Sequence, residues 1–93
     1  MKIKIYATLR DVAGSKSVHL DTASEITVGQ MLKELSIKYP NLHAKLHNPA
    51  TGELYTAIQI LINGRDMRYI KGMETIMTIE DDIRMFPPIG GGL

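Results

Sequence analysis

The segment Ala57-Ile58-Gln59-Ile60-Leu61-Ile62-Asn63-Gly64 decides the fold, because it joins the most apolar stretch of the chain to a strong turn signal. Ile58, Ile60 and Ile62 share one face of an extended chain, and Leu61 lies on the other face. A strand with apolar residues on both faces is typical of the interior of a sheet. Asn63-Gly64 favours a type I′ turn, in which both central residues need positive φ. The segment therefore predicts an interior strand over residues 57–62 that reverses into a second strand over residues 65–69.

The amino-terminal residues predict an antiparallel hairpin. Residues 2–7 and residues 16–20 both alternate between polar and apolar side chains, which is the pattern of a half-buried strand. Ala13-Gly14-Ser15 is a turn signal between the two stretches. The side chains expected to face inward are Ile3, Ile5, Ala7, Val18 and Leu20.

Two helices are expected in the middle of the chain. Thr27 is the predicted N-cap of the first helix, and Gln30 completes a capping box that satisfies two unpaired backbone N–H groups. Pro40 cannot continue this helix, and Asn41 is the predicted cap of a second, short helix that ends near His47. The apolar stripes are Val28, Met31, Leu32, Leu35 and Tyr39 in the first helix, and Leu42 and Leu46 in the second.

The carboxyl-terminal part completes the predicted topology. Glu80-Asp81-Asp82 is a turn signal, and residues 83–86 form the last predicted strand. The order strand, strand, helix, strand, strand, strand is that of the β-grasp, or ubiquitin-like, α+β fold. We expect a mixed sheet of four to five strands, one main helix and a short second helix, with the first and last strands parallel at the centre. The predicted core contains Ile3, Ile5, Val18, Leu32, Leu35, Ile58 and Ile60.

Length and composition limit the classes of function. The 93 residues suffice for one compact domain. A net charge of +1 argues against a nucleic-acid partner, which would need a strongly basic face. No apolar run is long enough to cross a membrane, and the start alternates instead of forming a signal region, so a cytoplasmic protein is expected. The absence of cysteine excludes disulfides, thiolate metal sites and a cysteine nucleophile.

The carboxyl terminus is the main candidate functional element. Gly90, Gly91 and Gly92 form a thin, extendable ribbon, because glycine has no Cβ. Such a ribbon can enter a narrow channel and present a terminal carboxylate there, and Pro87 and Pro88 would stiffen its exit from the sheet. The alternative is an ordinary frayed chain end. We expect a β-grasp domain over residues 1–88 and a flexible glycine-rich tail over residues 89–93.

Other polar groups have simpler explanations. His43 and His47 share one helix face at a spacing that can bind zinc, but without a third ligand we interpret them as two solvated histidines. Glu80-Asp81-Asp82 is interpreted as solvated turn residues. No catalytic constellation, metal site or cofactor is expected. A basic patch for solubility or docking would contain Lys2, Lys4, Arg65, Arg68 and Arg84, and the expected packing methionines are Met31, Met67, Met73, Met77 and Met85.

The assembled motifs resemble the MoaD/ThiS family of ubiquitin-like sulfur carriers, above all its MoaD branch and the archaeal small modifier proteins. The resemblance covers nearly the whole chain, and residues 66–69 with Gly72 also resemble CysO, a carrier used in cysteine synthesis. In chain order its parts are Leu9, Val12-Ala13-Gly14, Thr27-Val28-Gly29, Gly52-Glu53-Leu54-Tyr55, Ile62-Asn63-Gly64, Asp81-Asp82, Phe86-Pro87-Pro88 and Gly90-Gly91-Gly92.

This resemblance implies a carrier that other enzymes act on. An adenylating enzyme of the MoeB/ThiF type, similar to ubiquitin-activating enzymes, would convert the terminal glycine to an acyl-adenylate, and a sulfur donor would then give a thiocarboxylate. In the MoaD branch the tail inserts into a MoaE-like large subunit of molybdopterin synthase, for molybdenum or tungsten cofactor synthesis. In the alternatives, the glycine is joined to lysines of target proteins, or the carrier serves cysteine synthesis as CysO does. A further alternative is a β-grasp adaptor with an inert tail.

The resemblance assigns the activated tail to Gly90, Gly91 and Gly92. Leu93 departs from the family pattern, in which the chain ends at a glycine, so we expect that a form ending at Gly92 is the competent one. The expected partner-binding residues are Phe86, Pro87, Pro88, Tyr69 and Arg68, with Phe86 and Tyr69 as aromatic anchors on the open face of the sheet.

Overall fold

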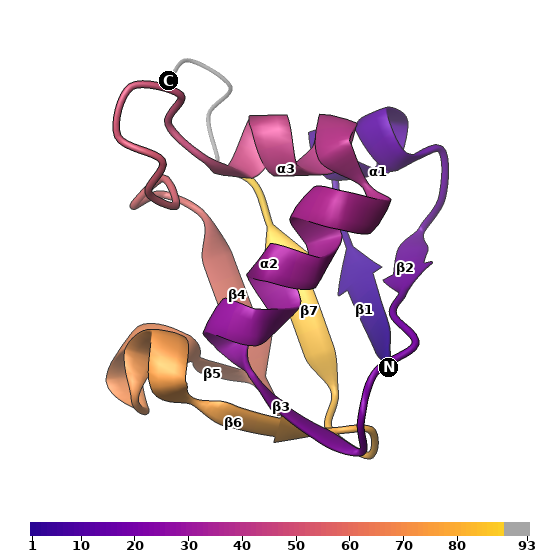
Figure 1. Ribbon diagram of the computed structural model, residues 1–93, viewed down its shortest axis with the longest axis vertical. Coiled ribbons are helices and arrows are strands. Elements are labelled where there is room, and N and C mark those ends of the chain that lie inside the picture. Colours follow the sequence, from indigo (N-terminus) through magenta and orange to yellow (C-terminus); the bar gives the residue numbers. More distant parts are fainter. Residues whose placement is uncertain (89–93) are drawn as a thin grey trace.

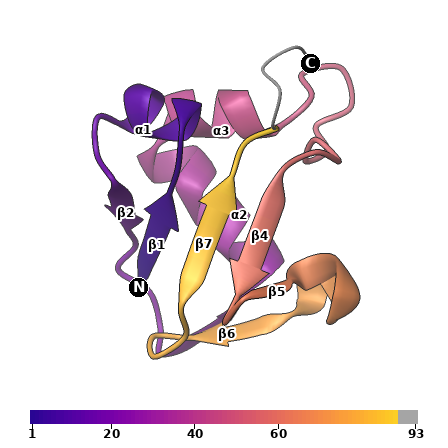
Figure 2. The same ribbon diagram turned by 180° about the vertical axis from the view of Figure 1, so that it is seen from behind.

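The computed structural model describes residues 1–88 and contains two β-sheets and three α-helices (Figures 1 and 2). The main sheet has five strands in the order β2-β1-β7-β4-β5, and β3 pairs with β6 in a second, two-stranded sheet. The predicted tail, residues 89–93, lies outside the described residues. The strands are β1 (Lys2–Ile5), β2 (Ser17–His19), β3 (Glu25–Thr27), β4 (Gln59–Ile62), β5 (Arg65–Asp66), β6 (Ile76–Thr78) and β7 (Ile83–Phe86). The helices are α1 (Thr8–Ala13), α2 (Val28–Lys38) and α3 (Pro40–Leu46), and two short 3₁₀ turns are η1 (Met67–Tyr69) and η2 (Gly72–Glu74).

The first and last strands lie side by side in the main sheet, as predicted. β1 and β7 are parallel, with Lys4 opposite Arg84 and Ile5 opposite Met85. β2 and β4 flank this pair as antiparallel neighbours. The predicted type I′ turn after β4 is confirmed, because Asn63 has φ 54° and Gly64 has φ 84°. The mixed sheet therefore confirms the β-grasp prediction.

The core lies between the main sheet and α2, which covers one face of the sheet (Figure 1). Thr27 caps α2 through its side chain, and Gln30 completes the capping box, as the sequence predicts. The other face of β1, β7 and β4 carries no helix (Figure 2). All seven predicted core residues are buried, namely Ile3, Ile5, Val18, Leu32, Leu35, Ile58 and Ile60.

The predicted hairpin has a helix in its connection. The turn signal at Ala13-Gly14-Ser15 is the end of α1, with Gly14 in the left-handed conformation at the C-cap. The prediction that Ala7 faces the core is wrong, because Ala7 is exposed and has φ 52° and ψ −131°. A helix of six residues is too short to give a clear periodic pattern, which explains why it was not predicted.

Two further predictions need correction, and one small sheet was not predicted. Asn41 does not cap α3, because the helix already begins at Pro40, whose fixed φ suits the first helical position. β5 spans only Arg65–Asp66 instead of reaching residue 69, since the Asp66 side chain accepts a hydrogen bond from the Arg68 N–H and starts η1. The small β3–β6 sheet was not predicted, because strands of three residues are too short to show an alternating pattern.

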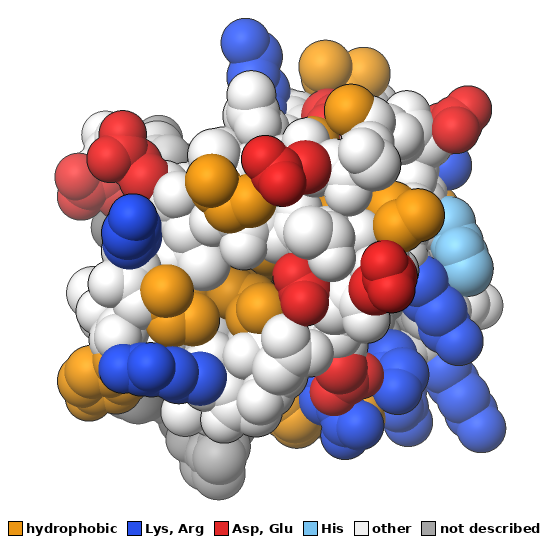
Figure 3. Space-filling view, turned by 90° about the horizontal axis from the view of Figure 1, so that it is seen from below, with side chains coloured by type: hydrophobic (Ala, Val, Ile, Leu, Met, Phe, Trp, Pro, Cys, Tyr) orange, Lys and Arg blue, Asp and Glu red, His pale blue; other side chains and the backbone are white. Residues whose placement is uncertain are grey.

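Residues 65–76 form a lobe at one corner of the molecule, where η1 and η2 follow β5 (Figure 1). Met67 anchors this lobe in the core, as predicted, whereas Met73 is 42% exposed, contrary to the packing role predicted for it. Figure 3 shows hydrophobic side chains next to Lys and Arg side chains on the side of the molecule where the lobe lies. The exposed large apolar residues of the lobe are Tyr69, Ile70, Met73 and Ile76.

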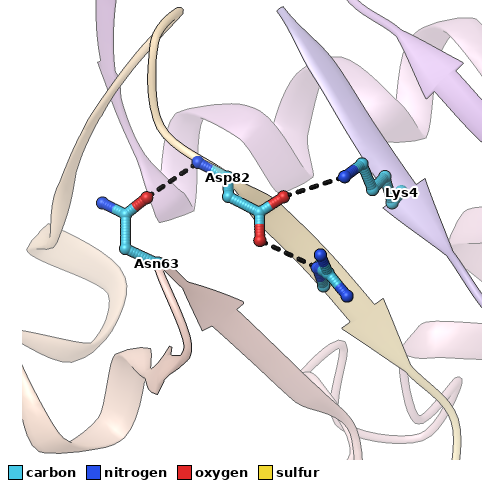
Figure 4. Close-up of polar contacts among 4 residues, drawn as sticks. Lys4, Asn63 and Asp82 are labelled. Atoms are coloured by element: carbon cyan, nitrogen blue, oxygen red, sulfur yellow. Dashed lines mark hydrogen bonds and ion pairs between the residues drawn. The ribbon is translucent and has the colours of Figure 1, made fainter.

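Asp82 links the central strands to the neighbouring turn (Figure 4). Its carboxylate accepts hydrogen bonds from Lys4 Nζ on β1, at 3.1 Å, and from Arg84 Nε on β7, at 2.8 Å. Its N–H donates to the side chain of Asn63 in the β4–β5 turn, at 2.9 Å. The expectation of simple solvated turn residues is therefore wrong for Asp82, which joins three segments distant in sequence.

We predict that Leu35→Ala destabilises the protein by about 2–5 kcal/mol, because Leu35 is 0% exposed and the substitution leaves a cavity under α2. Urea unfolding followed by circular dichroism measures the change. Ile37→Ala is the matched control on the same helix. Since Ile37 is 76% exposed, its loss is expected to change the free energy of unfolding by no more than about 0.5 kcal/mol. Equal losses for the two variants would contradict the placement of α2.

The Asp82 contacts predict a dependence of stability on pH. Hydrogen bonds from Lys4 and Arg84 lower the pKa of Asp82 below its ordinary value, so the ionised carboxylate stabilises the folded state. The stabilisation by the Asp82 carboxylate is present above the pKa of an aspartate in the unfolded chain, about 3.9. It is lost as the pH falls through the lower pKa that Asp82 has in the folded state. Asp82→Asn is expected to lower the urea midpoint at pH 7, and the difference from the unmodified chain should shrink in acid. Glu80→Gln, at an exposed neighbouring position, is the control, and a constant difference for Asp82→Asn at every pH would refute the assignment.

Candidate functional site

The chain leaves the main sheet at the end of β7, and this end is the candidate functional site. Phe86 is the last residue of the strand and pairs with Gln59 of β4. Pro87 is buried and Pro88 is half-buried, so both prolines belong to the domain. The predicted activated residues Gly90, Gly91 and Gly92 follow after Ile89 and lie outside the described residues.

An aromatic pair lies beside this exit. The rings of Tyr6 and Phe86 stack with their centroids 4.3 Å apart and an interplanar angle of 8°. The Arg10 guanidinium lies over the Tyr6 ring, 4.7 Å from its centroid, and Arg10 Nε donates a 2.6 Å hydrogen bond to the carbonyl oxygen of Ile5. The stack therefore ties α1, β1 and β7 together at the place where the chain leaves the sheet.

A strained turn brings Arg10 back over Tyr6. Leu9 N–H donates to the Tyr6 carbonyl at 3.2 Å, and Arg10 N–H donates to the Ala7 carbonyl at 2.9 Å. These bonds close a tight turn in which Ala7 has a positive φ of 52°, a conformation that side chains other than glycine rarely adopt. Strained residues tend to persist where the surrounding structure fixes them, often near functional sites. Here the stacked rings and the Arg10 contacts fix the turn.

The open sheet face beside the exit is cationic. Lys2 is exposed, and Lys4 and Arg84 are half-buried around the Asp82 carboxylate. The hydrogen bond and the charge of Asp82 raise the pKa of Arg84, and Tyr6 adds a smaller contribution in the same direction. The guanidinium therefore stays charged at every pH of biological interest. A partner that covers this face would meet an aromatic pair flanked by positive charge.

The structure separates the predicted partner-binding residues into two groups. Phe86, Pro87 and Pro88 lie together at the exit. Arg68 and Tyr69 lie instead in η1, which follows β5 at the opposite end of β4. The prediction that Tyr69 lies on the open sheet face is therefore wrong, although its 75% exposure leaves it accessible.

Tyr6 and Arg10 belong to the exit site and were not among the predicted site residues. Tyr6 occupies an outward position in the alternating pattern of residues 2–7, which is the one signal that could have revealed it. Its proximity to Phe86 follows from the parallel pairing of β1 and β7, which the sequence pattern does not encode.

The histidine pair forms as the helical spacing predicts, but it is not simply solvated. The rings of His43 and His47 are stacked with centroids 4.0 Å apart, and both residues are half-buried. Burial, and then the charge of His47, lower the pKa of His43. His19 is exposed on β2, as expected. Within residues 1–88 no three His, Cys, Asp or Glu side chains gather where they could hold a metal ion, and none of the helices there has the length and apolar character needed to cross a membrane.

Comparison with known proteins places this architecture among small carriers and modifiers. The chain is 33% identical over 92 residues to small archaeal modifier protein 3 of Haloferax volcanii, a match that covers 99% of this chain and 98% of that protein. It is 30% identical over 80 residues to the sulfur carrier protein CysO of Mycobacterium tuberculosis, covering 85% of this chain and 83% of that protein. The crystal structure of SAMP1 from Haloferax volcanii superposes with a TM-score of 0.81 at 34% identity, covering 99% of this chain and 98% of that one.

These similarities extend over the exit site as well as the core. The model of the ThiS family matches residues 3–92, which include all of β7, all but the first residue of β1, and the three glycines before Leu93. The relatives described above are small ubiquitin-like carriers and modifiers. The chain therefore belongs to the ThiS family.

Proposed function

We propose that this protein is a sulfur carrier whose terminal glycine is adenylated and converted to a thiocarboxylate, as a MoaD-like small subunit for molybdenum or tungsten cofactor synthesis. The observation that carries the proposal is the exit geometry. The chain leaves the main sheet through Pro87 and Pro88 beside an open sheet face, and Ile89 and then three glycines follow in the sequence. Residues 1–88 would be the docking body and residues 89–93 the reactive tail. A carrier that needs ATP for activation would act in the cytoplasm.

The chemistry belongs to the carboxyl terminus and to partner enzymes. A carboxylate oxygen of the terminal glycine attacks the α-phosphorus of ATP, which releases pyrophosphate and leaves an acyl-adenylate. A sulfur donor then displaces AMP and forms the thiocarboxylate. The adenylating enzyme would be of the MoeB/ThiF type, and a MoaE-like synthase subunit would receive the tail. Glycine suits both steps, because a chain without Cβ atoms passes through a narrow channel.

A second candidate function is conjugation to lysine side chains of target proteins. The similarity to small archaeal modifier protein 3 favours this function. The similarity to CysO favours sulfur transfer instead, and a sulfur carrier of that kind could serve cysteine synthesis. Both functions need the same acyl-adenylate, and they differ in whether sulfur or an amine displaces AMP. Mass spectrometry of the protein from its host distinguishes them, since a thiocarboxylate and an isopeptide conjugate differ in mass.

We predict that the form ending at Gly92 is the best substrate for adenylation. Leu93 adds an isobutyl group to a channel shaped for glycine, and overpacking of about 1–3 kcal/mol corresponds to about a five- to 150-fold loss of rate. It also moves the carboxyl group by about 3.5 Å along an extended chain. ATP–pyrophosphate exchange by the host's adenylating enzyme measures the rates for the full-length chain and for forms ending at Gly92 and Gly91. Equal exchange for the full-length chain and the Gly92 form would refute the role of Leu93, and the absence of exchange for all forms would refute the proposed function.

The exit site predicts which substitutions weaken the adenylating enzyme's recognition of the carrier. Phe86→Ala removes half of the aromatic stack. Loss of an aromatic side chain at the centre of an interface costs about 1–2 kcal/mol of binding free energy, so the KM for the carrier is expected to rise about five- to thirtyfold. Phe86→Tyr keeps the stacked ring and should stay close to the unmodified chain. Ile37→Ser, on the exposed side of α2, is the control for loss of an apolar side chain. Thermal unfolding shows whether each variant is folded, and an unchanged KM for folded Phe86→Ala would contradict the site.

A further inference from the structure

Two histidines at the end of α3 form a stacked pair that the proposed function does not use. The centroids of the His43 and His47 rings lie 4.0 Å apart at an interplanar angle of 26°, and both residues are half-buried. Nδ1 of His47 donates a 3.1 Å hydrogen bond to the carbonyl oxygen of His43, because a carbonyl oxygen can only accept. This bond leaves Nε2 of His47 as the nitrogen of that ring that can take up a proton.

The His43 ring lies where a positive charge is unfavourable. Its Nδ1 is buried and has no hydrogen-bond partner within residues 1–88. A neutral ring can keep its proton on Nε2, whereas a protonated ring would hold a buried N–H without an acceptor, which costs free energy. Burial, and then the charge of His47, accordingly lower the pKa of His43. Protonation of both histidines would place two like charges on rings whose centroids are 4.0 Å apart.

The charged groups that face the pair do not compensate a protonated His43. Both histidines line a cavity to which α2 contributes Lys33, the segment after α3 contributes Glu53, and η1 contributes Arg68. The Asp66 carboxylate lies 3.4 Å from the guanidinium of Arg68 and offsets its charge. Lys33 and Glu53 carry opposite charges, and neither lies within hydrogen-bonding distance of the buried Nδ1. Acid therefore acts against the stacked arrangement.

The same pair lies where the loop between α3 and β4, residues 47–58, is attached to the helix (Figure 1). His47 is the C-cap of α3 and forms an isolated β-bridge with Leu54, which packs against the core. Beside this bridge, the N–H of Tyr55 donates to the carbonyl oxygen of Leu46 at 2.9 Å. A displacement of His47 therefore acts directly on the contacts that hold the loop against the helix.

The far end of the loop reaches the exit of the chain. Residues 55–57 line a second cavity, of about 500 Å³, together with Pro88. A loop that comes away from α3 would change this surface, because it supplies one wall of the cavity.

We propose that the His43–His47 pair is a pH-sensitive clasp, which holds residues 47–58 on α3 while both rings are neutral and releases them when the pair takes up protons in acid. The opened loop would remove the Leu54 and Tyr55 contacts and leave the main sheet intact. This clasp goes beyond the proposed function and does not depend on it.

The direction of the response follows from proton linkage. Because burial lowers the pKa of His43, the closed loop binds fewer protons than the open loop, in which the ring is solvated. The closed loop is therefore fully stable above the ordinary histidine pKa of about 6.5. It loses stability as the pH falls below that value, and the loss is complete below the lower pKa of the closed state.

The test is nuclear magnetic resonance of the full chain from about pH 8 to about pH 5, the range in which histidines titrate. Ring nitrogen shifts are expected to show that neutral His43 carries its proton on Nε2 and titrates below the ordinary value. Amide exchange of Tyr55, compared with an unstructured chain at the same pH, reports loop opening. Its protection should fall by up to about tenfold per pH unit for each proton taken up. The Ile5 N–H, which donates to the Lys16 carbonyl at 3.0 Å in the sheet, should keep its protection.

Variants assign the response to His43. His43→Phe keeps an aromatic ring in the stack and cannot take up a proton, so the protection of the Tyr55 N–H should no longer fall in acid. His43→Leu should lose the response as well, and it gives a second reading where the phenyl ring does not fit. His19→Phe is the matched control, because His19 is exposed on β2 and lies outside the pair, and it should respond like the unmodified chain. Circular dichroism shows whether each variant is folded.

Three results would overturn the clasp. The first is a His43 that titrates at the ordinary value. The second is an equal loss of protection for the Tyr55 and Ile5 amides, which would mean that acid unfolds the whole domain. The third is a response that survives in the folded His43 variants and so belongs to another group. The first two are read on the unmodified chain, so they decide the question even if a variant does not fold.

Discussion

The parallel pairing of the first strand with the last is the constraint on which the rest of the structure depends. Parallel neighbours cannot be joined by a tight turn, so the chain between β1 and β7 must cross over, and α2 makes that crossing over one face of the sheet. Asp82 reinforces the pairing, because its carboxylate binds Lys4 on one strand and Arg84 on the other. The antiparallel strands β2 and β4 then extend the sheet on both sides.

The same pairing creates the exit site. In a parallel pair the carboxyl ends of both strands meet at one edge of the sheet. Ile5 lies opposite Met85, so the next residues, Tyr6 and Phe86, come face to face and stack. The last strand therefore ends beside residues from the start of the chain. The tight turn at Ala7, which returns Arg10 to the Tyr6 ring, adds α1 to this edge.

The fold divides its accessible features between two sides. The open sheet face and the exit carry the aromatic stack and the charges around Asp82. The cavity beside α2 carries a different set, with an apolar floor and charges of both signs, because Lys33 and Glu53 line it and Arg68 is paired with Asp66. The lobe supplies the second side, and its inner residues Met67 and Thr75 are buried while Tyr69 is exposed.

The sequence by itself determined the elements whose signal is local. Alternation placed the core residues of the strands correctly, such as Ile58 and Ile60, apart from Ala7, and helical spacing placed those of α2. The Thr27–Gln30 capping box marked the start of α2, and Asn63-Gly64 specified its turn. Only the tertiary structure decided the features that depend on distant contacts or on very short segments. The strands β3 and β6 pair across about fifty residues of chain and are too short for periodicity to show. Tyr69 does not lie on the predicted sheet face, because Asp66 starts a 3₁₀ turn before it. Tyr6 belongs to the exit site because the strand register places it against Phe86, and no local sequence pattern encodes that register.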